Sequence, residues 1–167
     1  MKYVLVFAAL VFASGAFAQG TESEGISQFG AYVGNTLPNG IDGAEEIFPL
    51  WGIRYAHAIG PASFIDFSTF AGHSEGVEWT GAAVGISMQA PVETLIGHAG
   101  IGLDYTRYST STSETKNTGG GHFIGGILSP IGGNVLARFD MKLNTKPGTS
   151  LYFAIGLVFA LDGGDGQ

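Results

Sequence analysis

Three consecutive polar residues, His73, Ser74 and Glu75, are of the types that form a hydrolase active site. A serine nucleophile needs a base within hydrogen-bond reach, and the base needs a third group that orients it. Neighbouring residues in an extended chain point to opposite sides, so this run cannot by itself bring base and nucleophile together. We expect a polar loop at residues 73–76, no catalytic residue and no enzymatic activity.

The histidines give no support to metal chemistry. His57, His73, His98 and His122 do not show the spacing of metal ligands. The chain contains no cysteine, so it has no disulfide framework. We therefore expect no metal and no cofactor, and we interpret His57 as a residue at a membrane interface.

Six charged residues form a third candidate set. Apolar residues alternate with them along the chain, so the charged side chains share one face of the expected strands. Three bases and three acids on one face predict an ion-pair network inside a narrow barrel, where each charge offsets the burial cost of another. These predicted lumen charges are Arg54, Asp66, Asp104, Arg138, Asp140 and Lys142. Two alternatives stay open: some of the six lie in loops, or the set forms a path for protons or ions.

The alternation is clearest in the last expected strand, residues 150–161. Its odd-numbered positions carry large apolar side chains, namely Leu151, Phe153, Ile155, Leu157, Phe159 and Leu161, whereas the even-numbered positions carry Tyr, Ala, Gly and Val. A soluble barrel places apolar side chains inward and polar ones outward. Bulky apolar residues opposite small ones instead fit a narrow barrel whose outer wall contacts lipid.

The same pattern recurs along the chain and predicts eight strands, at about residues 25–35, 47–59, 62–72, 77–90, 94–109, 122–128, 134–144 and 150–161. Polar connections at 37–46, 73–76 and 110–121 alternate with short turns, as extracellular loops alternate with periplasmic turns. We predict an all-β fold, an eight-stranded antiparallel up-and-down transmembrane β-barrel, with a mobile loop at 110–121 and both termini in the periplasm. Its candidate aromatic girdle is Trp51, Tyr55, Trp79 and Tyr105.

The length of 167 residues is enough for one domain that follows a cleaved N-terminal segment. Lys2, an apolar run at 3–13 and Ala16-Phe17-Ala18 predict a signal peptide at 1–18, followed by a barrel domain at 19–167. The run is short for a membrane anchor, which is the alternative. The formal net charge is −7, and removal of the one positive charge of Lys2 makes it −8. Such an acidic chain lacks the basic face that a nucleic-acid partner requires.

Residues 125–130, 135–143 and 150–161 resemble the closing hairpins of small eight-stranded outer-membrane barrels, the group of the OmpA transmembrane domain, OmpX and the opacity proteins. Gly156, Phe159 and Leu161 resemble the C-terminal assembly signal of such barrels. Two departures are Ala154, where a polar residue is usual, and residues 162–167, which follow the signal. The resemblance implies a Gram-negative outer membrane, contact with its lipid and lipopolysaccharide, and insertion by the barrel assembly machinery.

The resemblance implies no single activity, because members serve as adhesins, structural anchors and membrane-stress proteins. The first hypothesis is a monomeric outer-membrane barrel with a side-chain-filled lumen. It acts structurally or through surface loops that bind an extracellular ligand, in adhesion or membrane integrity. The alternatives are a narrow channel, a small-ligand-binding barrel of the soluble lipocalin type, and a lipid-modifying enzyme, since some lipid A deacylases use His, Ser and Glu.

Overall fold

The computed structural model describes residues 26–44 and 46–161, which form eight β-strands. Their bounds are β1 Gln28–Leu37, β2 Phe48–Ala58, β3 Ser63–Ser74, β4 Val77–Val92, β5 Leu95–Thr110, β6 Ser113–Gly132, β7 Val135–Asn144 and β8 Ser150–Ala160. The predicted signal peptide and the tail at 162–167 fall outside the described residues. No helix among the described residues is long and apolar enough to cross a membrane.

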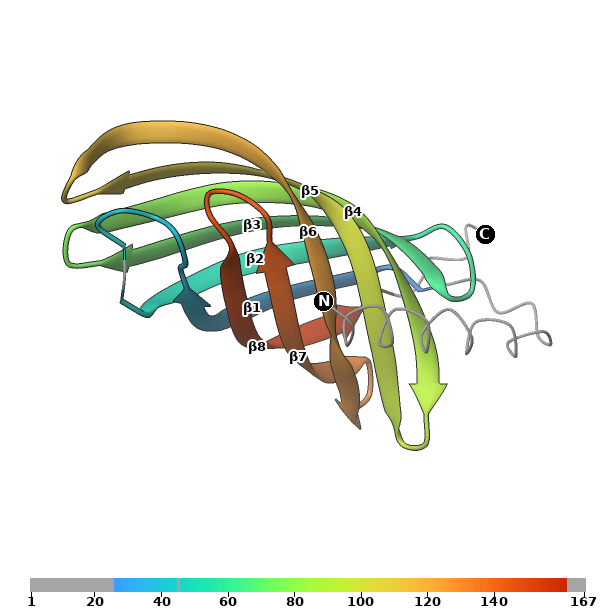
Figure 1. The fold of residues 1–167 in the computed structure, drawn as a ribbon. Coiled ribbons are helices and arrows are strands. Elements are labelled where there is room, and N and C mark those ends of the chain that lie inside the picture. Colours follow the sequence, from blue (N-terminus) through green and yellow to red (C-terminus); the bar gives the residue numbers. More distant parts are fainter. Residues whose placement is uncertain (1–25, 45, 162–167) are drawn as a thin grey trace.

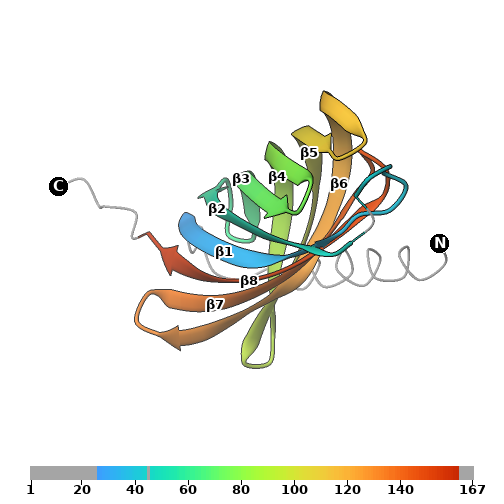
Figure 2. The ribbon, with the colours of Figure 1, turned by 90° about the vertical axis from the view of Figure 1, so that its left-hand side faces the viewer.

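The strands close into a barrel. Each strand pairs antiparallel with the next in sequence, and β1 pairs with β8 (Figures 1 and 2). Closure gives the backbone groups of the shared wall a partner on both sides, which a sheet in a hydrocarbon environment requires. The predicted eight-stranded antiparallel barrel is confirmed.

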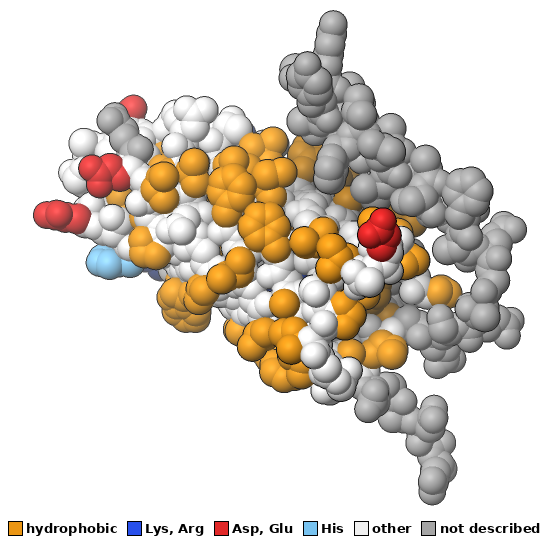
Figure 3. Space-filling view, turned by 90° about the horizontal axis from the view of Figure 1, so that it is seen from below, with side chains coloured by type: hydrophobic (Ala, Val, Ile, Leu, Met, Phe, Trp, Pro, Cys, Tyr) orange, Lys and Arg blue, Asp and Glu red, His pale blue; other side chains and the backbone are white. Residues whose placement is uncertain are grey.

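Most large apolar side chains of the strands lie outside this barrel, whereas the inside holds small and polar side chains together with a few buried aromatic ones such as Phe48, Phe70 and Trp79. Leu103 is 67% exposed, whereas its neighbour Asp104 is 4% exposed. Every strand contributes to an outer surface that we call the apolar belt, with Val33, Ile53, Phe67, Ile86, Leu103, Phe123, Phe139 and Ile155 as one member from each strand. Figure 3 shows hydrophobic side chains spread over the side of the wall that faces the viewer. This is the arrangement of a barrel surrounded by lipid, the reverse of one in water.

The predicted mobile loop at residues 110–121 is wrong. The chain turns at Ser111 and Thr112, and β6 begins at Ser113. The polar residues and glycines of this segment show no apolar alternation, but β5 pairs with them, as Tyr108 pairs with Lys116, with one shift of register between Tyr108 and Thr110. Pairing with a neighbour overrides a weak intrinsic strand preference. The strand expected at 122–128 is therefore the middle of a 20-residue strand.

The other connections agree with the prediction only in part. Residues 38–47 between β1 and β2, and residues 145–149 between β7 and β8, form the longer connections. The predicted polar loop at 73–76 is instead the end of β3 and a tight turn at Glu75 and Gly76, where Gly76 has a φ of 74°. We call the barrel end that carries these connections and the β5–β6 turn the loop end. The opposite end is the turn end.

Trp79 does not belong to an outer aromatic girdle. Its side chain is 1% exposed and lies inside the barrel. The centroid of its ring lies 5.6 Å from that of the Phe48 ring and 5.4 Å from that of the Tyr108 ring. Side chains of a strand alternate between its two faces, and this alternation places Trp79 on the inner face of β4 together with Gly81. The position of Trp79 along the strand therefore decides where its side chain lies, and its being aromatic does not. The other three candidates, Trp51, Tyr55 and Tyr105, are exposed on the outer wall.

Candidate functional site

The lumen is the candidate site, because the strands bring all six predicted charges into it. Arg54 lies on β2, Asp66 on β3 and Asp104 on β5, whereas Arg138, Asp140 and Lys142 lie on β7. All six occupy the inner positions of their strands, and their sequence neighbours on the outer face are apolar. Arg54, Asp104, Arg138 and Asp140 are at most 8% exposed.

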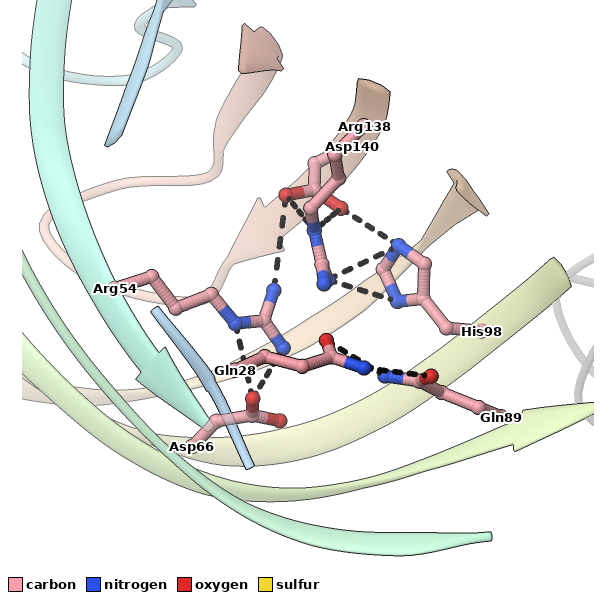
Figure 4. Close-up of polar contacts among 7 residues, drawn as sticks. All are labelled: Gln28, Arg54, Asp66, Gln89, His98, Arg138 and Asp140. Carbon is pink, nitrogen blue, oxygen red and sulfur yellow. Dashed lines mark hydrogen bonds and ion pairs between the residues drawn. The ribbon is translucent and has the colours of Figure 1, made fainter. Parts of the chain in front are cut away.

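Asp140 is the centre of the larger ion-pair network (Figure 4). Arg138 donates from Nε to both carboxylate oxygens of Asp140, at 2.8 and 2.7 Å. Nε2 of His98 lies 2.6 Å from Oδ1 of Asp140, and Nη1 of Arg54 lies 3.6 Å from Oδ2. Arg54 also donates to Asp66, from Nε at 2.9 Å and from Nη2. The network therefore connects β2, β3, β5 and β7 across the interior.

His98 sits between an acid and a base in this network. Nη2 of Arg138 lies 3.1 Å from both ring nitrogens of His98. Because guanidinium groups only donate, one ring nitrogen must accept. The consistent assignment is the tautomer in which Nε2–H donates to Asp140 and Nδ1 accepts from Arg138. His98 thus couples the two side chains and is not a free base.

A second network surrounds Asp104 on the side of the loop end. Nζ of Lys142 lies 2.5 Å from one carboxylate oxygen of Asp104, and Nδ1 of His122 lies 3.0 Å from the other. The ammonium group also lies 5.2 Å from the ring centroid of Phe70 and 5.8 Å from that of Tyr152. Aromatic faces attract a cation when water is excluded. Each charge of this network therefore has partners within the lumen.

An amide pair crosses the lumen beside the first network. Nε2 of Gln28 donates to Oε1 of Gln89 at 3.2 Å, and the reverse bond has the same length (Figure 4). Gln28 lies on β1 and Gln89 on β4, and these strands are not neighbours in the sheet. The pair therefore links opposite walls of the barrel.

The space left inside is small. A cavity of about 50 Å³ lies between the two networks, with Arg54, Asp140, His122 and Lys142 in its lining. This is room for a few water molecules. An eight-stranded barrel is just wide enough for side chains to fill it, and the ion pairs fill this one. The described residues contain no group of three or more His, Asp and Glu side chains placed to hold a metal ion.

The predicted set of lumen charges leaves out four polar residues that the structure places beside them: His98, His122, Gln28 and Gln89. Their positions in the strand period carried the available signal, because each lies on the inner face of its strand. Which acid each histidine meets depends on the stagger between strands, which the period does not give. The partner of Arg138, unknown from sequence, is Asp140.

The loop between β1 and β2 covers the lumen at the loop end. Thr110 donates from Oγ1 to the carbonyl of Asp42 at 3.0 Å, and the amide of Thr149 donates to the carbonyl of Asn39 at 2.9 Å. These bonds tie the loop to the β5–β6 turn and to the β7–β8 loop. Under it lies the loop-end cluster, the buried side chains Ile41, Ala44, Phe48, Phe70, Val77 and Trp79. An apolar layer therefore separates the polar lumen from the loop end.

The remaining candidates are not members of the two lumen networks, although Gly156 pairs with Arg138 across β7 and β8. Gly156 allows β1 to approach, because a Cβ there would lie 2.9 Å from Cβ of Tyr32. Phe159 and Leu161 are exposed on the outer wall. His57 is exposed near the turn end, with Nδ1 3.3 Å from the hydroxyl of Tyr55. The last candidates are His73, Ser74 and Glu75, which span the end of β3 and the turn that follows it.

No protein-family model and no curated protein sequence matches the chain. Solved structures do match. The N-terminal β-barrel domain of Pseudomonas aeruginosa OprF aligns with a TM-score of 0.66 at 12% identity, over 83% of this chain and 100% of that one. Neisserial surface protein A aligns with a TM-score of 0.62 at 11% identity, over 83% of this chain and 98% of that one.

The attachment invasion locus protein Ail of Yersinia pestis aligns with a TM-score of 0.54 at 12% identity, over 83% of this chain and 100% of that one. Ail has also been solved in complex with the heparin analogue sucrose octasulfate. At these identities the likeness concerns the fold alone. The chain has the fold of the small eight-stranded outer-membrane β-barrels.

Proposed function

We propose that this protein is an integral barrel of a Gram-negative outer membrane, exported by a signal peptide and inserted by the barrel assembly machinery. The apolar belt carries this proposal. Large side chains such as Leu103 and Ile155 face outward, and charged side chains such as Asp104 face inward. Burial of the belt in lipid removes its apolar surface from water, which is the main driving force available to such a wall. Phe159 and Leu161 belong to this wall and, with Gly156, form the proposed assembly signal.

The lumen is proposed to be structural and closed to solutes. Its charges meet one another at hydrogen-bond distance, as Lys142 meets Asp104 at 2.5 Å, and the loop-end cluster lies above them. The alternative of a narrow channel, or of a barrel that holds a small ligand, requires an opening through these contacts. Steady single-channel conductance in planar bilayers would favour the channel over the closed barrel.

The biological action is proposed to lie at the loop end, in adhesion or in membrane integrity. The β5–β6 hairpin lies at this end (Figure 1) and presents polar, exposed residues such as Glu114 and Asn117. Ail, a structural neighbour, is named for attachment and binds a sulfated sugar analogue in one of its structures. Lipid and lipopolysaccharide around the belt are the other proposed partners.

A lipid-modifying enzyme is the weaker alternative. His73 and Ser74 are successive residues of one strand, so their side chains point to opposite faces of the wall. Lipid A from cells with and without the protein should therefore have the same mass spectrum. A deacylated species that depends on the protein would overturn this.

Membrane fractionation tests the proposed location. We expect the expressed full chain to sediment with outer membranes, to resist extraction by alkaline carbonate and urea, and to enter solution only with detergent. Purified protein should float with lipid vesicles on a density gradient. A folded, detergent-free protein in the periplasmic extract would instead identify a soluble barrel, and the proposal would be abandoned.

A further inference from the structure

The outer wall of the barrel contains a groove on the side formed by β7, β8, β1 and β2. Its volume is about 560 Å³, within the range of about 300–1,000 Å³ that is typical of ligand pockets. One row of paired, outward side chains crosses these four strands and borders the groove, in the order Phe139, Ile155, Val33 and Trp51. Each of the four is at least 42% exposed. The groove is therefore continuous with the apolar belt.

The floor of the groove is backbone. A second row nearer to the loop end consists of Phe153, Asn35 and Pro49, which pair with one another across β8, β1 and β2. Leu50 and Ala154 also line the groove, although their side chains are buried inside the barrel. They contribute their main chain, because successive side chains of a strand point to opposite faces. The groove therefore opens outward, away from the lumen charges.

The part of the groove nearest to the loop end is polar. Asn35 and His73 line it, are exposed, and lie within two residues of the ends of β1 and β3. The side-chain amide of Asn35 has no hydrogen-bond partner among the described residues. Such an amide both donates and accepts, and it is costly beside hydrocarbon when it is left unpaired. The groove therefore combines an apolar length with an unpaired hydrogen-bonding group at one end.

The chemistry of the lining restricts the type of lipid that fits. Among the described residues that line the groove, none is a lysine or an arginine, so a phosphate group finds no cation there. The acyl chains of glycerophospholipids begin at ester groups, which only accept hydrogen bonds. The amide-linked and hydroxylated acyl chains of lipopolysaccharide carry N–H and O–H donors as well as acceptors. These groups match the two-sided hydrogen-bonding capacity of Asn35.

We propose that this groove binds an acyl chain of lipopolysaccharide, with the amide and hydroxyl groups of the chain beside Asn35 and His73. The chain lies along β1, between Trp51 of β2 and Phe153 of β8. The inference rests on the proposed membrane location, in which the loop end faces outward and the groove lies in the outer leaflet. Lipid meets the rest of the belt as a solvent, whereas it occupies the groove as a ligand.

Native mass spectrometry of the full chain tests this inference. The protein is purified in detergent, incubated with lipid A and an equal molar amount of phosphatidylethanolamine, and freed of detergent in the gas phase. We expect one molecule of lipid A to stay bound in preference to phosphatidylethanolamine. Lipid A that lacks one phosphate should bind equally well, because the groove offers phosphate no cation.

Two variants of Asn35 test the position. Asn35→Leu removes the amide at similar volume and should weaken the binding of lipid A about tenfold, as expected for one or two lost hydrogen bonds. Asn35→Trp fills the groove and should abolish binding. Thr80 gives the matched controls, because it is an exposed, outward residue of β4 that does not line the groove. Thr80→Leu and Thr80→Trp should bind lipid A like the native chain, and heat-dependent migration in gels verifies folding of all variants.

Other results overturn the inference. Unchanged binding of lipid A by Asn35→Trp would place the lipid elsewhere, and equal retention of phosphatidylethanolamine would mean that the groove does not select lipopolysaccharide. Loss of binding on removal of a phosphate would assign recognition to cations outside the groove. Flotation with lipid vesicles requires the belt but not the groove. A native chain that floats without retaining lipid A therefore contradicts this inference alone, whereas one that does not float contradicts the proposed function.

Discussion

At the scale of single residues, the lumen charges act in pairs whose members cannot be removed one at a time. Arg138 contacts Asp140 and His98, and all three are buried. A carboxylate that keeps its charge but loses its partner bears the full cost of desolvation. The polar networks therefore constrain the strands to one arrangement, whether or not they raise the total stability.

Arg138→Met should lower the free energy of unfolding in lipid vesicles by about 3–5 kcal/mol, because it removes the main ion-pair partner of the buried Asp140 carboxylate. The double variant Arg138→Met with Asp140→Leu should recover part of that loss. Arg138→Met with Asp104→Asn is the matched control, because Asp104 belongs to the other network, and its effects should add. Urea titration of each variant measures these values. Simple addition in both double variants would contradict the assigned pairing.

Leu103→Arg tests the outer wall. Leu103 is among the most exposed members of the apolar belt, and a cation near the midplane of the bilayer costs about 2–4 kcal/mol in a barrel. Leu103→Ala is the control, because it shortens the side chain without adding a charge. Folding yield in lipid vesicles should fall strongly for the arginine variant and slightly for the alanine variant. Equal yields would place Leu103 outside the lipid.

At the scale of strands, close approach of the backbones depends on particular glycines. A Cβ at Gly102 would lie 2.5 Å from Cε1 of His122 and 2.7 Å from Cα of Gly85, whereas a Cβ at Gly97 would have 3.4 Å to its nearest neighbour, Val92. Overpacking of this kind costs about 1–3 kcal/mol. Gly102→Ala should destabilise the barrel to urea, whereas Gly97→Ala in the same strand should be tolerated. If both variants unfold alike, the inner packing of β5 is not as described.

Residues 116–120 of β6, which pair with β5 but have no partner strand on their other side, should show alternating hydrogen exchange in dilute detergent solution. The amides of Lys116, Thr118 and Gly120 face β5 and should be protected, whereas those of Asn117 and Gly119 face the side without a partner strand and should exchange rapidly. Residue-resolved exchange by NMR measures this. Phe123 is the control, since it also faces β7 but has Leu143 as a partner and should be protected. Uniformly fast exchange would restore a mobile loop in place of the strand.

Strand periodicity predicted which residues face inward and outward over most of the barrel wall. The predictions that failed have separate physical reasons. The inner and outer faces of β5, β7 and β8 follow directly from alternating side chains in the sequence. Residues 113–121 carry no such alternation, and they become a strand because β5 lies beside them. Trp79 was assigned to the outer girdle because it is aromatic, although its position in the alternation along β4 places it inside the barrel. Contacts between strands, such as His98 with Asp140, depend on the barrel stagger and could not be read from any one strand.

At the scale of the whole molecule, we propose that lipid surrounds the outer wall of the barrel and that the interior is sealed from this lipid. The two tryptophans report on these two environments. Trp51 is 62% exposed in the apolar belt, whereas Trp79 is enclosed between Phe48 and Tyr108. No other residue of the chain is a tryptophan. Fluorescence of single-tryptophan variants can therefore separate the outside of the barrel from its inside.

The decisive measurement is quenching by lipids with brominated acyl chains, in vesicles that contain the folded Trp79→Phe or Trp51→Phe variant. We expect strong quenching when Trp51 is the remaining tryptophan and weak quenching when Trp79 remains. Phenylalanine preserves an aromatic ring at each position, and heat-dependent migration in gels verifies folding of both variants. Equal quenching, or quenching of Trp79 alone, would contradict a lipid-facing belt around a sealed lumen.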